Sequence, residues 1–71
     1  MTYIKKGYGF DVGQNFARAV EDTPIEIDTV QGCWIYGYIA GNPQSSLAFM
    51  RAPRIRVRVR NDCLSKLHTA A

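Results

Sequence analysis

The stretch "RIRVRVR", Arg54 to Arg60, decides which fold this chain of 71 residues can adopt. Arginine and β-branched aliphatic residues alternate through it without interruption. Successive side chains of a β-strand point to opposite faces, so the arginines project to one side and Ile55, Val57 and Val59 to the other. The stretch therefore predicts an antiparallel strand with its aliphatic face on a core and its arginine face toward solvent.

Further strands are predicted on the N-terminal side of this stretch. "IEIDTV" (residues 25–30) alternates with period two, and "CWIYGYIA" (residues 33–40) is apolar on both faces. "SSLAFM" (residues 45–50) predicts a shorter strand, preceded by the turn residues "GNPQ". "YIKKGYGF" (residues 3–10) predicts a first strand, although its two glycines weaken it.

One helix is predicted after this first strand, over residues 12–22. Asp11 followed by Gln14 resembles a capping box. Apolar side chains then recur at helical spacing at Val12, Phe16, Ala19 and Val20. The pair Thr23-Pro24 ends the pattern, because proline disfavours helical geometry in the residue before it. Near the C-terminus, residues 62–71 predict a helical turn that then frays.

The predicted fold class is mainly β (α+β), in the order β-α-β-β-β-β, as a single domain over residues 1–71. The expected architecture is a small curled antiparallel sheet or an SH3-like or Sm-like barrel, with the short N-terminal helix closing one end. An open α+β sheet with the helix on one face is the alternative. A domain this small has a thin core. A homodimer formed through a self-association surface therefore remains one of the alternatives.

The loop between the strands of residues 25–30 and 33–40 decides which side chains share a face. A two-residue turn at Gln31-Gly32 needs a positive φ at Gln31, whereas a three-residue loop over residues 30–32 needs it only at Gly32. The three-residue loop is favoured, and it places Ile25, Ile27 and Thr29 beside Cys33, Ile35 and Gly37. Glu26 and Asp28 then share the other face with the aromatic residues. The two-residue turn would bury the aromatics instead.

Composition and motifs exclude several function classes. The longest apolar run, "CWIYGYIAG", falls short of the roughly 20 residues that span a membrane, and the first residues lack the apolar segment of a signal peptide. We therefore expect no membrane association and a cytoplasmic location, in the host cell if a phage encodes the chain. Cys33, Cys63 and His68 do not have the spacing of a metal site. We expect two reduced thiols, no cofactor, no catalytic residue and no enzymatic activity.

The net charge of +3 is distributed unevenly along the chain. Residues 11–28 hold five acidic side chains against Arg18 alone, and residues 51–60 hold five arginines and no acid. Same-side residues of a strand lie about 7 Å apart, similar to successive phosphates of an extended single strand, and aromatic side chains beside arginines suit base stacking as well as protein interfaces. The candidate binding residues are therefore Arg51, Arg54, Arg56, Arg58, Arg60, Trp34, Tyr36 and Tyr38.

Two interpretations of the arginine row remain open at the level of the sequence. Glu26 and Asp28 have the same period-two spacing and can form cross-strand pairs with two of the arginines, which would make the face internally salt-bridged. Two acids do not neutralise four arginines together with Arg51, and this excess favours a binding row.

The stretch "KKGYGF" (residues 5–10) resembles the ribonucleoprotein motif of cold-shock domains, whose aromatics stack on bases. The match stops at Asp11, where that family has an aliphatic residue, and no second aromatic motif follows. We interpret it as a coincidence of composition.

In size and overall character the chain resembles small inhibitor proteins of phages and mobile elements, including anti-CRISPR proteins. That resemblance implies a non-catalytic inhibitor or adaptor that docks on a larger protein or ribonucleoprotein complex. The alternative is an SH3-like or Sm-like module that binds RNA or single-stranded DNA directly.

Overall fold

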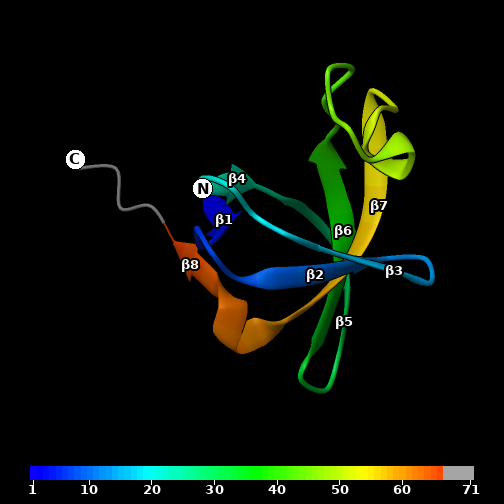
Figure 1. The fold of residues 1–71 in the computed structure, drawn as a ribbon. Helices are drawn as coiled ribbons and strands as arrows, with labels where there is room; N and C mark the ends of the chain where they lie inside the picture. Colours follow the sequence, from blue (N-terminus) through cyan, green and yellow to red (C-terminus); the bar gives the residue numbers. More distant parts are fainter. Residues whose placement is uncertain (67–71) are drawn as a thin grey trace.

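The chain folds into two antiparallel β-sheets, as Figure 1 shows for the computed structural model, which describes residues 1–66. The five-stranded sheet has the order β3-β2-β7-β6-β5, and the three-stranded sheet has the order β4-β1-β8. The strands are β1 (Thr2–Ile4), β2 (Gly9–Val12), β3 (Asn15–Arg18), β4 (Thr23–Pro24), β5 (Glu26–Gln31), β6 (Trp34–Ala40), β7 (Arg54–Arg60) and β8 (Leu64–Lys66). Helical geometry within residues 1–66 is limited to two short 3₁₀ turns, η1 (Ala48–Met50) and η2 (Asn61–Cys63).

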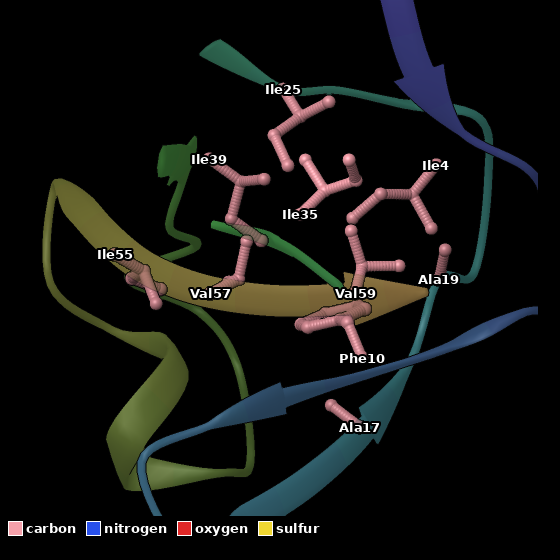
Figure 2. Packing of buried hydrophobic residues seen from close by; sticks show 10 residues of the cluster. All are labelled: Ile4, Phe10, Ala17, Ala19, Ile25, Ile35, Ile39, Ile55, Val57 and Val59. Atoms are coloured by element: carbon pink, nitrogen blue, oxygen red, sulfur yellow. The ribbon is translucent and has the colours of Figure 1, made fainter. Parts of the chain in front are cut away.

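The core lies between the two sheets and is entirely aliphatic apart from one phenylalanine (Figure 2). Strand β7 is central to it, because Ile55, Val57 and Val59 all point inward as the alternation predicts. The other members come from the N-terminal half and from β6. The buried residues are Ile4, Phe10, Ala17, Ala19, Ile25, Ile35, Ile39, Ile55, Val57 and Val59.

The predicted helix over residues 12–22 is wrong, because the segment forms the β2–β3 hairpin. Gly13 has a φ of 61° and occupies the first of two turn positions between Val12 and Asn15, the pattern of a type II′ turn. The hairpin register pairs Phe10 with Ala17 on the core side. A glycine that favours a tight turn, together with inward alternation, thus outweighs the helical spacing of the apolar residues.

The predicted first strand over residues 3–10 is divided in two. The amide of Tyr8 donates a hydrogen bond to the carbonyl of Lys5 at 3.0 Å, and Gly7 has a φ of 85°. These are the features of a type II turn with glycine at its third position. The turn separates β1 from β2 and sends the two strands into different sheets.

The predicted strand over residues 45–50 is also wrong. Local side-chain bonds hold the β6–β7 connection instead: the amide of Gln44 donates to Asn42 Oδ1 at 2.9 Å, and the amide of Leu47 donates to Ser45 Oγ at 3.1 Å. Short polar side chains that capture nearby amides compete with strand pairing. The predicted C-terminal helical turn is limited to η2, and β8 follows it; the rest of that prediction lies outside the described residues.

The five-stranded sheet is open, so the predicted barrel is wrong, whereas the mainly β, antiparallel character is confirmed. Its edge strands, β3 and β5, do not pair with each other. The inner side keeps a concavity of about 940 Å³ whose lining includes Ile25, Ile39 and Met50. The three-stranded sheet covers part of the core without closing the five-stranded sheet into a barrel (Figure 1).

The β5–β6 connection differs from both predicted loops, because its two turn residues are Gly32 and Cys33. Gly32 has a φ of 61°, so the glycine takes the first turn position and Gln31 pairs with Trp34. A β-bulge then inserts Asp28 between the pairs Ile27–Gly37 and Thr29–Tyr36. Thr29 therefore lies on the aromatic face, contrary to the prediction that it shares the face of Ile27.

Candidate functional site

The structure gathers seven of the eight predicted binding residues on the outer face of the five-stranded sheet. Strands β6 and β7 pair in full register, and directly opposed side chains of an antiparallel pair share a face. Trp34 lies opposite Arg60, Tyr36 opposite Arg58, and Tyr38 opposite Arg56. We call this set the arginine–aromatic face; it comprises Arg54, Arg56, Arg58, Arg60, Trp34, Tyr36 and Tyr38.

Two of the arginines reach across β6 toward the acids of β5. The guanidinium of Arg54 lies 3.8 Å from the ring centre of Tyr38, and its Nη2 is 2.9 Å from Glu26 Oε1. Arg56 donates from Nη1 to the hydroxyl of Tyr38 at 2.9 Å and to Asp28 Oδ2 at 3.2 Å. Because β6 lies between β7 and β5, these side chains lie along the face instead of standing out from it.

The other two arginines are paired with acids outside β5. Arg58 donates from Nη2 and Nε to Asp11 Oδ2 at 2.7 and 3.2 Å, and its guanidinium lies 4.0 Å from the ring centre of Trp34. Asp11 is the direct neighbour of Arg58 on β2. Arg60 Nε lies 3.9 Å from Asp62 Oδ1, the longest of the four ion pairs.

The face is therefore charge-compensated although it is open to solvent. Each arginine of β7 has a carboxylate within 4 Å, and the arginine side chains keep between 42% and 60% of their exposure. The expectation that only two acids face this row is wrong, since Asp11 and Asp62 supply the other partners. The four arginines and their four acids cancel in formal charge, so the net charge of +3 comes from the other residues of the sequence.

Hydrogen bonds further stabilise the charged form of two of the guanidinium groups. The bond to the hydroxyl of Tyr38 raises the pKa of Arg56 above its ordinary value, and Asp28 adds to the effect. The pKa of Arg58 is raised chiefly by its bond to Asp11. A partner that binds this face meets fixed cations whose geometry is already set by rings and carboxylates.

Arg51 is the predicted binding residue that the structure places elsewhere. It follows η1, and its Nε donates to the carbonyl of Ser45 at 2.8 Å within the β6–β7 connection. Sequence reasoning missed Asp11 because the residue was assigned to a helix cap. A tight turn at Gly13, between two short stretches that alternate in polarity, would have indicated that Asp11 lies on a strand.

Other site types have no geometric support in the part of the chain that the structure describes. Residues 1–66 contain no cluster of three or more histidine, cysteine, aspartate or glutamate side chains that could hold a metal ion. Cys33 and Cys63 are free thiols, and His68 lies outside the described residues. Over the same range, no helix is both long and apolar enough to cross a membrane.

Comparison with known proteins gives no relative from which a function could be inferred. No protein-family model, curated protein sequence or solved structure matches this chain. The geometry of the arginine–aromatic face is therefore the basis for inferring a function.

Proposed function

We propose that this chain is a non-catalytic protein-binding module, an adaptor or inhibitor that docks on a larger protein or nucleoprotein complex through the arginine–aromatic face. The observation that carries the proposal is that every arginine of β7 is paired with a carboxylate and yet keeps at least 42% of its side-chain surface open to solvent. Tryptophan, tyrosine and arginine are the residue types that dominate protein-interface hot spots. Side chains already ordered by rings and ion pairs lose less entropy on binding.

The same observation weighs against direct binding of a phosphate backbone. A phosphate that approached Arg54 or Arg58 would compete with Glu26 or Asp11, each at hydrogen-bond distance from its arginine. It would also bring a negative charge next to that carboxylate, which costs energy. Direct binding of RNA or single-stranded DNA is therefore the competing outcome of the experiment below.

The kind of complex follows from the resemblance in size and character to phage inhibitors. A nucleic-acid-handling complex in the cytoplasm of the host cell is the partner class that this resemblance supports. The paired arginines are compatible with an acidic or polar protein groove on such a complex, because they offer planar donors without a large excess of charge.

The test uses a charge-swapped variant that keeps the ion pair but exchanges its ends, Asp28→Arg with Arg56→Asp. Because the pair is retained, we expect the melting temperature to stay close to that of the wild type, while the guanidinium moves to β5. The immobilised wild type and the variant are incubated with a bacterial lysate with and without nuclease, and retained proteins are compared by mass spectrometry. Lys6→Glu serves as a control that changes charge away from the face.

The proposal predicts proteins that the wild type and Lys6→Glu retain after nuclease treatment and that the charge-swapped variant loses. Retention of the same proteins by the charge-swapped variant would exclude this face as the docking surface. Binding is also measured with random-sequence single-stranded RNA and DNA at two salt concentrations. Tight binding that falls by about 0.7 log units per log unit of salt for each phosphate contacted would establish the nucleic-acid alternative.

A further inference from the structure

A hollow of about 180 Å³ adjoins the arginine–aromatic face at the point where β2 leaves β7. Strands β2 and β7 share the single residue pair Asp11–Arg58. Beyond it, Gly9 of β2 and Arg60 of β7 do not pair with each other. Figure 1 shows β2 crossing β7 steeply at this point. The divergence of the strands opens the hollow, which is lined by Gly9, Phe10, Asp11, Phe16, Trp34, Arg58, Val59, Arg60 and Cys63.

Two aromatic residues from non-adjacent strands line this hollow, one of them exposed (Phe16) and the other half-buried (Trp34). Phe16 comes from β3 and Trp34 from β6, with β2 and β7 between them in the sheet. Phe16 is 58% exposed and lies over Gly9, where an added Cβ would meet its ring. Phe10 and Val59, both buried, also line the hollow. The hollow is therefore an apolar recess whose walls include two rings.

The size and the surroundings of the recess indicate what it can accept. A cavity of about 150 Å³ is sufficient to bind benzene, so this recess accommodates one six-membered ring and little more. Its charged lining is compensated, since Asp11 pairs with Arg58 and Asp62 lies beside Arg60. A neutral ring fits these surroundings, and ring walls favour an aromatic occupant over an aliphatic one.

We propose that the recess between Phe16 and Trp34 receives one aromatic side chain of the protein partner. This inference rests on the proposed function and names the anchor of the interface. Arg60 supplies the second contact: it is 3.9 Å from Asp62 and is held less closely than the other arginines of β7. Its guanidinium can turn to a carbonyl or carboxylate next to the inserted ring.

The probe for this site is N-acetyl-phenylalanine amide, compared with N-acetyl-leucine amide and adenosine monophosphate. Trp34 is the only tryptophan of the chain, so its fluorescence reports on the recess directly. We expect a saturable change with the phenylalanine probe and a dissociation constant on the order of 1 mM, the scale for a ligand of this size. We expect the dissociation constants of the other two compounds to be at least about fivefold higher.

Alkylation of the two thiols gives a second readout with an internal control. Cys63 lines the recess, whereas Cys33 lies in the exposed β5–β6 turn. Bound phenylalanine probe should slow the alkylation of Cys63 and leave that of Cys33 unchanged. Equal protection of Cys63 by the leucine compound or the nucleotide, or no protection at the solubility limit of the phenylalanine probe, would overturn the inference.

Two variants distinguish the contribution of the recess from that of the arginine–aromatic face as a whole. Phe16→Ala removes an exposed wall, and we expect it to abolish the probe response while the chain stays folded; Tyr8→Ala, at another exposed aromatic, should leave that response intact. In the lysate experiment, Phe16→Ala should lose the partner. If it keeps the partner while the charge-swapped variant loses it, the aromatic anchor is wrong and the proposed function stands. If both variants keep the partner, the proposed function fails as well.

Discussion

The two faces of β7 divide its seven residues between them and differ in what they contribute. On the inner face, Ile55, Val57 and Val59 are between 1% and 4% exposed and pack among the aliphatic residues of both sheets. On the outer face, four arginines lie across aromatic rings and reach carboxylates of other elements. The inner row is closely packed and shielded from solvent. The outer row is held in place by its contacts but remains accessible to solvent.

The strand thus assigns core packing and exposed polar contacts to separate side chains. Burial of apolar surface contributes far more to folding than exposed ion pairs do. The outer row nevertheless has a structural effect, since its pairs connect β7 with β2 and, across β6, with β5. Substitutions on the two faces should therefore change the stability of the chain by different amounts and for different physical reasons.

The largest expected effect is a loss of stability from the inner row. We predict that Ile55→Ala lowers the free energy of unfolding by about 3 kcal/mol, because it removes buried methyl groups and leaves a cavity. Urea unfolding followed by Trp34 fluorescence measures the change. Arg54→Ala, at the neighbouring residue of the opposite face, is the matched control and should change stability far less. Equal losses for the two variants would remove the distinction between the faces.

A smaller effect is expected from the most buried ion pair of the outer row. Asp11 is 26% exposed and accepts two hydrogen bonds from Arg58. Asp11→Asn keeps the shape of the side chain but removes its charge, so we predict a fall in melting temperature of about 5 °C. Thermal unfolding followed by circular dichroism measures it. An unchanged melting temperature would show that this pair does not connect β2 with β7.

A still smaller effect is predicted for the same kind of change at the open end of the row. Glu26 and Arg54 are both more than half exposed, so Glu26→Gln should cost less than about 0.5 kcal/mol. High salt should reduce even this difference, because it screens exposed charges. Urea unfolding at two salt concentrations tests the prediction. A loss of stability as large as that of Asp11→Asn would mean that solvent exposure does not determine how much each ion pair contributes.

The smallest effect concerns Cys63, which lies at the boundary between the two faces. Burial raises the pKa of its thiol, and Asp62 acts in the same direction. A raised pKa in the folded state adds stability below about pH 9.0, the ordinary value, and this contribution is lost as the pH rises through the folded-state value. We predict that the alkylation rate of Cys63 has its midpoint above pH 9.0. A midpoint at or below that value would contradict this account.

The sequence was sufficient to predict the strands that carry the arginine–aromatic face. The alternation of Arg54 to Arg60 is confirmed for both faces of β7, and the stretches that form β5 and β6 are confirmed within one residue at each end. Such patterns are reliable because the side-chain period of a strand matches a half-buried position and no other regular structure. The grouping of Trp34, Tyr36 and Tyr38 with the arginines follows from the β6–β7 register.

The N-terminal half could not be predicted in the same way. Val12, Phe16 and Ala19 fit a helical period, but only Ala19 is buried, and Phe16 points to the outer face. Tertiary pairing with β7 decided the outcome, and that pairing is not visible in the local sequence. The compensation of the arginines was missed for the same reason, because Asp11 reaches Arg58 only through the sheet order.

The bulge at Asp28 has a consequence for the behaviour of the protein at high concentration. Strand β5 is an edge strand with exposed Ile27 and Val30, and a free edge of this kind can template aggregation. The bulge interrupts the ladder that another molecule would have to extend, and an in-register copy would set Glu26 against Glu26 and Asp28 against Asp28. The residue that pairs with Arg56 on the arginine–aromatic face thus also disfavours edge-to-edge pairing of two copies of the chain.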